Sequence, residues 1–320
     1  VLNKMNERYY QEACAVMNEV KKVVIGKDEC VRLAMAAILA GGHILIDDIP
    51  GVGKTTLAMA FSETMALQNN RLQFTPDVMP SDLLGFSMYQ KQTGTFEYQT
   101  GAVMCNLFLG DEINRTSPKT QSALLEVMEE GNVTVDGVTR KVPEPFVVIA
   151  TENPAGSVGT QLLPESQLDR FMICTSLGYP SLENEIAIVK GRQIQDDKAV
   201  LQPVINAEQL LYCKKLVEQI YMADDIYRYL CELCQTTRTN PLIELGVSPR
   251  GSVALMRISK AIAFLHGRDY VIPGDIDEIF LDVAAHRLVR SAKAKAAKRS
   301  AESILIEVMQ NVKKPTAARR

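Results

Sequence analysis

The chain has 320 residues, of which 47% are hydrophobic and 23% are charged, an ordinary composition for a globular protein with more than one core. The formal net charge of −3 argues against general nucleic-acid binding. Seven cysteines show no dense disulfide framework, which favours a reducing compartment. The longest apolar run, at 33–46, is too short to cross a bilayer. We therefore expect a cytoplasmic protein.

Up to about residue 180, short apolar runs alternate with longer segments of helical pattern. Short runs rich in Ile, Leu, Val and Phe predict the strands of a parallel sheet with helices on both faces, an α/β fold. The expected strands are 43–47, 71–74, 107–109, 146–150 and 172–175.

Between these strands, the pair Ser117-Pro118 supplies an N-cap and a proline at the first helical position. Gly131 offers a stop for the same helix. The next segment predicts a hairpin around Asp136-Gly137, because the central residues of a type I′ turn both need positive φ.

Beyond residue 180 the pattern is helical, with no convincing strand. We expect one domain at 1–180, a helical domain at 181–312 and a disordered tail at 313–320. Ser248-Pro249 begins one helix, and Asp275 with Glu278 resembles a capping box for the next. The basic stretch 287–299 is typical of a helix with a solvated basic face, although an anionic partner is an alternative.

The strongest motif is the glycine-rich loop at 50–56, which follows the apolar run at 43–47 and precedes a helical pattern. Its glycines let backbone N–H groups approach phosphate oxygens, and the following helix N-terminus adds positive potential. Lys54 is positioned to reach the β and γ phosphates, and Thr55 to offer a hydroxyl to Mg²⁺. The predicted binding residues are Pro50, Gly51, Val52, Gly53, Lys54, Thr55 and Thr56. The loop departs from the strict motif at Asp48, where the pattern has glycine.

An acidic pair follows the apolar run 107–109. At a strand tip beside the phosphate loop, Asp111 would hold the magnesium shell. Glu112 would orient the attacking water and accept its proton as a general base.

Four further side chains are candidates for completing the site. Asn153 follows the apolar run 146–150 and could position water or sense the γ-phosphate, although an Asn before Pro154 is also an ordinary loop cap. Arg250 lies in the first turn of a helix, where the dipole disfavours a cation, so an anion such as a nucleotide phosphate is its expected partner. Arg115 and Arg170 are the remaining basic candidates.

In this order the motifs resemble those of the MoxR branch of the AAA+ ATPases. The resemblance rests on segments spread over residues 20–290, chiefly 48–55, Asp111-Glu112-Ile113-Asn114-Arg115, 150–154, Leu168-Asp169-Arg170-Phe171 and 248–250. It implies a P-loop NTPase with an αβα core, a five-stranded parallel sheet of order 5-1-4-3-2 and an all-α lid. The missing first glycine of the loop is common in that branch.

The resemblance also implies roles that spacing alone does not show. Asn153 would be sensor 1, Arg250 would be sensor 2 from the lid, and Arg170 would be an arginine finger acting on the neighbouring subunit's nucleotide. Arg115 would lie at the same interface. The adenine pocket would be lined by Val24, Ile25 and Gly26. The segment 86–99 would be the insertion in helix 2 and, like the hairpin at 136–137, a contact for a client.

Members of this branch are expected to bind ATP with Mg²⁺, form hexameric rings and remodel protein clients with a separate von Willebrand factor A domain partner. Three alternatives remain: a magnesium-chelatase-like motor subunit, a nucleotide-gated binding module with little turnover, and a DNA-acting motor. Stimulation by a tetrapyrrole-carrying partner, single-turnover assays and salt-dependent DNA titration would separate them.

Overall fold

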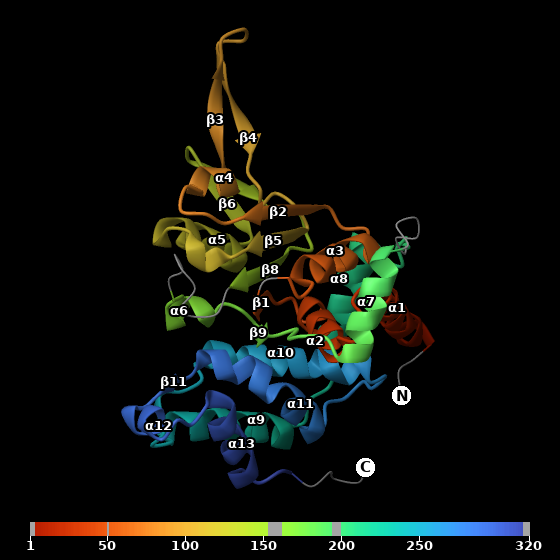
Figure 1. Ribbon diagram of the computed structural model, residues 1–320, viewed down its shortest axis with the longest axis vertical. Helices are drawn as coiled ribbons and strands as arrows, with labels where there is room; N and C mark the ends of the chain where they lie inside the picture. The colour runs from red at the N-terminus through yellow and green to blue at the C-terminus, as the bar shows by residue number, and fades with distance from the viewer. Residues whose placement is uncertain (1–3, 50, 153–161, 194–199, 316–320) are drawn as a thin grey trace.

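The computed structural model describes residues 4–49, 51–152, 162–193 and 200–315. It places an α/β core above a layer of helices, with a long hairpin projecting from the core at the end remote from those helices (Figure 1). The α/β core followed by a helical lid is the architecture expected from the sequence.

The core is built on five parallel strands. In spatial order they are β2 (Asn69–Gln73), β5 (Leu107–Asp111), β8 (Val147–Glu152), β1 (Ile44–Asp47) and β9 (Ile173–Thr175). Every neighbouring pair is parallel. If the five strands of this sheet are numbered 1 to 5 in chain order, their spatial order is 2-3-4-1-5, which is the expected order 5-1-4-3-2 read from the opposite edge. Because parallel strands share one direction, the carboxyl ends of β1, β5 and β8 lie at the same edge of the sheet.

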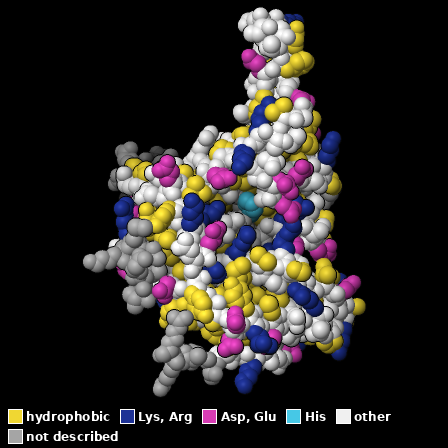
Figure 2. Space-filling model, turned by 180° about the vertical axis from the view of Figure 1, so that it is seen from behind, with side chains coloured by type: hydrophobic (Ala, Val, Ile, Leu, Met, Phe, Trp, Pro, Cys, Tyr) yellow, Lys and Arg dark blue, Asp and Glu magenta, His cyan; other side chains and the backbone are white. Residues whose placement is uncertain are grey.

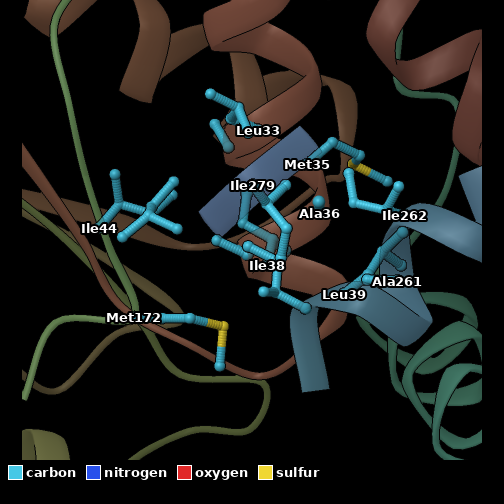
Figure 3. Close-up of a cluster of buried hydrophobic side chains, with 14 of the residues drawn as sticks. Leu33, Met35, Ala36, Ile38, Leu39, Ile44, Met172, Ala261, Ile262 and Ile279 are labelled. Atoms are coloured by element: carbon cyan, nitrogen blue, oxygen red, sulfur yellow. The ribbon is translucent and has the colours of Figure 1, made fainter. Parts of the chain in front are cut away.

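Helices pack on both faces of the sheet and complete two apolar cores. The helices of the core are α1 (Lys4–Lys21), α2 (Asp28–Leu39), α3 (Lys54–Thr64), α4 (Pro80–Leu84), α5 (Pro118–Glu130) and α6 (Glu165–Leu168), with a 3-10 turn η1 (Ile113–Arg115). One cluster extends from the sheet into the lid, where Ile38 of α2 lies near Ile262 and Ile279 (Figure 3). The core and the lid therefore share a continuous apolar interior.

Two antiparallel hairpins project from the core. The longer pairs β3 (Gly85–Gln90) with β4 (Thr95–Thr100) and forms the projection in Figure 1. It contains the segment 86–99 that was expected as an insertion. The shorter pairs β6 (Asn132–Val135) with β7 (Val138–Lys141). Its turn residues Asp136 and Gly137 have φ of 52° and 75°, so the predicted turn is confirmed.

The lid contains helices and, against expectation, two short strands. Strands β10 (Ile243–Leu245) and β11 (Val289–Arg290) pair antiparallel, too briefly to give an alternating sequence pattern. The helices from residue 182 onward are α7 (Leu182–Gln193), α8 (Ala207–Glu218), α9 (Asp224–Thr239), α10 (Pro249–Leu265), α11 (Pro273–Ala284), η2 (Ala285–Arg287), α12 (Ala292–Ala296) and α13 (Ala301–Asn311).

The helix signals are confirmed in two places and shifted in a third. Ser117 and Ser248 cap α5 and α10, and each side chain accepts a bond from a backbone N–H of the first turn. Helix α11 instead begins at Pro273, and Asp275 at its third position accepts a hydrogen bond from the N–H of Ile272 at 2.8 Å. The proline starts the helix one turn earlier than the acidic pair suggested.

The basic stretch 287–299 is not a helix with a uniformly solvated face. Arg287 is only 4% exposed, and its Nε donates to Asp169 Oδ1 at 2.8 Å. Arg290 donates a hydrogen bond to the backbone carbonyl of Arg299, and Arg299 forms an ion pair with Glu307. Within the described ranges, no helix is both long and apolar enough to cross a membrane. The tail predicted at 313–320 is described only as far as residue 315.

Candidate functional site

The phosphate loop lies where the sequence predicted it, between the end of β1 and the start of α3. Gly51 and Gly53 have φ of 89° and 101°, a conformation that glycine adopts without strain. A Cβ at either position would have no neighbour within 4 Å, so the space beside the loop is open. Thr55 and Thr56 lie in the first turn of α3 and Val52 in the loop, whereas Pro50 is outside the described residues.

Lys54 lies within electrostatic range of the acids expected beside it. The side chain is 9% exposed, and its Nζ donates to the backbone oxygen of Asp48 at 2.6 Å. Burial lowers the pKa of Lys54, and the negative charges of Asp48, Asp111 and Glu112 oppose that shift. The lysine of the phosphate loop and the acidic pair at the tip of β5 therefore interact electrostatically at one edge of the sheet.

Asp48 explains why this loop can lack its first glycine. Its carboxylate accepts hydrogen bonds from the N–H of Ile49 at 2.8 Å, the N–H of Gly178 at 2.7 Å and the hydroxyl of Ser176 at 3.0 Å. Ser176 and Gly178 follow strand β9, so the side chain ties the phosphate loop to the neighbouring strand's exit. A glycine at this position has no side chain to make these bonds.

Asp111 is 5% exposed at the tip of β5 and is held by two side chains. Arg71 Nε donates to Asp111 Oδ2 at 2.7 Å, and the Thr151 hydroxyl donates to Oδ1 at 3.4 Å. Thr151 Oγ1 also accepts the N–H of Glu112 at 2.9 Å. A threonine on β8 therefore joins both members of the acidic pair, a role for which the sequence offered no motif.

Glu112 adopts a strained backbone at the end of the strand. Its φ of 57° and ψ of 50° place it in the left-handed region. Few non-glycine residues adopt this conformation, and those that do are concentrated at functional sites. Arg115 Nη1 lies 2.8 Å from Glu112 Oε2. The structure thus pairs Arg115 with Glu112 of its own chain.

The donor set at this sheet edge fits magnesium held together with a triphosphate. In a phosphate-loop site the protein supplies only a Ser or Thr hydroxyl and one acid, and the nucleotide and water supply the rest. Thr55 is the second residue of α3 and Asp111 ends β5, so both are at this edge.

Arg170 and Arg250 lie together, away from this edge. Arg170 Nη1 is 2.6 Å from Glu129 Oε2, and Arg250 Nη2 pairs with Glu129 Oε1. They line a hollow of about 180 Å³ with residues 41–43, which precede β1, whereas the phosphate loop follows β1. Figure 2 shows acidic and basic side chains gathered around a hollow between core and lid. The arginines are therefore at the opposite end of the sheet from their own phosphate loop.

A second hollow lies near the predicted adenine-binding segment. Val24 is buried, Ile25 is partly buried and Gly26 is exposed. Gly26 lines a hollow of about 400 Å³ together with residues 175–177, directly before the Gly178 that contacts Asp48. This places the segment beside the phosphate loop. Asn153, predicted as sensor 1, lies outside the described residues.

The sheet order, the phosphate loop facing an acidic strand tip and the appended helical lid together define an AAA+ domain. Residues 43–173 match the model of an ATPase family associated with various cellular activities, and residues 235–308 match an AAA lid domain.

Three relatives cover almost the entire chain. The protein YeaC of Bacillus subtilis is 46% identical over 299 residues, 93% of each chain. The chaperone MoxR1 of Mycobacterium tuberculosis is 35% identical over 306 residues, 93% of this chain and 81% of the relative. A crystal structure of a Cytophaga hutchinsonii protein superposes with a TM-score of 0.91 at 34% identity, covering 97% of both chains. The chain belongs to the MoxR family of AAA+ ATPases.

Proposed function

We propose that this protein hydrolyses ATP with Mg²⁺ and uses the energy to remodel or activate a protein client. The observation that carries the proposal is the placement of Lys54 within the electrostatic reach of Asp111 and Glu112 at one sheet edge. Membership of a chaperone-containing ATPase family supports the client.

In this proposal each residue of the edge has a separate task. The N–H groups around Gly51 and Gly53 cradle the phosphates, and Lys54 exchanges the Asp48 carbonyl for a phosphate oxygen. Thr55 and Asp111 would hold Mg²⁺, which neutralises phosphate charge when bound. Glu112 orients the attacking water and takes its proton, for which its carboxylate must turn from Arg115. Asn153, which comes directly after β8 in the sequence, would sense the γ-phosphate.

The position of Arg170 and Arg250 favours catalysis between subunits. Because both lie at the opposite end of the sheet from their own phosphate loop, we infer that they reach the nucleotide of a neighbouring copy. Arg170 acts as the finger and Arg250 as sensor 2, and Arg115 adds a third cation near the interface. A closed ring, a hexamer by family expectation, supplies every site with this neighbour.

The remaining assignments follow the same proposal. Gly26 borders the hollow beside the phosphate loop and contacts the adenine there. Val24 and Ile25, directly before it in the chain, complete this contact. The hairpin β3–β4 carries exposed Tyr89 and Phe96 and is a contact for the client. A von Willebrand factor A domain protein is the expected separate partner.

The decisive experiment measures ATP binding and turnover of a Glu112→Gln variant across protein concentrations. Wild-type turnover per subunit should rise with concentration as neighbours assemble, and the variant should bind ATP with unchanged affinity while losing at least about a hundredfold in kcat. Normal hydrolysis by the variant would exclude Glu112 as the base. A wild-type rate independent of concentration would argue against a catalytic neighbour.

A further inference from the structure

The acid between the two arginines has no place in the motifs of the phosphate-loop site. Glu129 lies in the last turn of α5 and offers one carboxylate oxygen to each arginine, Oε2 to Arg170 and Oε1 to Arg250. Arg170 comes from the segment before β9 in the core, and Arg250 from α10 in the lid. One side chain therefore bridges the two domains at the point where two cations converge.

The helix ends make this contact unusual. A helix C-terminus disfavours an anion and a helix N-terminus disfavours a cation. Glu129 lies at the C-terminal turn of α5, which has no basic residue of its own, and Arg250 at the N-terminal turn of α10. Each charge is therefore unfavourable at its own helix end, and each is stabilised by the opposite charge on the other helix.

Both arginine side chains remain partly exposed, at 31% for Arg170 and 44% for Arg250, so an anion from a neighbouring subunit can approach them. Glu129 engages a single nitrogen of Arg170, Nη1, which also donates to the Leu125 carbonyl at 3.0 Å. The Nε of Arg170 is buried without a hydrogen-bond partner among the described residues. For Arg250 the pairing with Glu129 involves Nη2. Both guanidinium groups are thus held on one side by the acid.

We propose that Glu129 is a positioning residue, which holds Arg170 and Arg250 side by side for the triphosphate of a neighbouring subunit. Two guanidinium groups repel each other at short range, and the shared carboxylate offsets this repulsion before the phosphate arrives. Pre-arranged cations stabilise the charge that develops in phosphoryl transfer without reorganising. The proposal rests on the proposed ATPase function, and it adds the residue that aligns the arginines contributed by core and lid.

The test compares Glu129→Gln with Glu130→Gln, the exposed neighbour on the same helical turn, in steady-state ATP hydrolysis at saturating protein concentration. Glu129→Gln should lower kcat about ten- to hundredfold, the effect of a small misplacement of catalytic groups, with the KM for ATP within about twofold. Glu130→Gln should match the wild type. Light scattering and thermal unfolding confirm that both variants assemble and fold.

Two further variants separate positioning from a general structural role. Glu129→Gln should lower kcat no further in a background that carries both Arg170→Ala and Arg250→Ala, because the acid acts through those two arginines. Glu129→Asp keeps the charge but shortens the reach, so its kcat should be intermediate. A Glu129→Gln kcat within twofold of the wild type, or above it, would overturn the proposal. If the wild type shows no concentration-dependent hydrolysis, the ATPase proposal fails instead.

Discussion

Replacing Asp48 with glycine would restore the standard phosphate-loop sequence, and we expect it to destabilise this protein. The Asp48 carboxylate is 6% exposed and accepts three hydrogen bonds, two of them from the segment after β9. Hydrogen bonds to charged groups contribute about 1.5–3 kcal/mol each. Asp48→Gly loses both long-range bonds and leaves the N–H of Gly178 without its acceptor, so the free energy of unfolding should fall by about 3–5 kcal/mol.

Urea denaturation measures this change directly. A globular domain has about 5–15 kcal/mol of stability, so the predicted loss would move the midpoint strongly while the protein still folds. The ATP concentration needed for half-saturation in the presence of Mg²⁺ should also rise, because the phosphate loop is no longer anchored to the segment after β9. Ser176→Ala removes one donor to the same carboxylate; because Ser176 is exposed, the loss should be smaller than for a buried bond, about 1 kcal/mol.

The coupling between these positions gives the sharpest refutation. Once Asp48 is glycine, Ser176 has lost that acceptor, so Ser176→Ala should add almost nothing in the Asp48→Gly background. An unfolding free energy of Asp48→Gly within about 1 kcal/mol of the wild type, well below the estimate from its hydrogen bonds, would refute the anchoring role. Fully additive effects of the two substitutions would refute it equally.

Two other predictions concern a buried histidine and a buried hydroxyl. His43 Nε2 donates to the Met128 carbonyl and its Nδ1 accepts the N–H of Val148, each at 3.0 Å, and burial lowers its pKa to about 4. Because the folded protein keeps this ring neutral while the unfolded chain binds a proton, the free energy of unfolding should fall by roughly 3 kcal/mol between pH 6.5 and pH 4. Denaturation at several pH values should show a weaker pH dependence of this free energy for His43→Gln. An unchanged pH dependence would contradict the prediction. Thr151→Val removes the hydroxyl that joins Asp111 and Glu112 and should lower kcat about tenfold with little effect on ATP affinity. The exposed Thr134→Val variant is the control and should match the wild type. A kcat of Thr151→Val equal to that of the wild type would show that the hydroxyl is dispensable.

The sequence was sufficient to predict the phosphate loop, the acidic pair and the order of the sheet. The loop and the pair are contiguous motifs with a local physical cause, and the sheet order came from the family resemblance. The two strands of the lid were missed because three and two residues are too few to establish a pattern. The start of α11 was misplaced because Asp275 caps from inside the helix, after Pro273.

The functional contacts that the sequence did not predict are all long-range. Arg71 and Thr151 meet Asp111 from neighbouring strands, and Glu129 meets arginines from two domains. None of these residues belongs to a recognisable motif, since each gains its role from side chains about 40 or more positions away. The positive charge of Arg250 at a helix N-terminus did predict a nearby anion. The expected anion was a nucleotide phosphate, whereas the anion that Arg250 contacts within its own chain is Glu129.

The apolar interior shared by α2, α10 and α11 (Figure 3) limits how this molecule can move. Swinging the lid away from the sheet would expose Ile38, Ile262 and Ile279 to water, at about 25 cal/mol for every Å² of apolar surface uncovered. The core and the lid of one chain should therefore move together as one unit. In the proposed ring, any large movement would then occur between neighbouring chains.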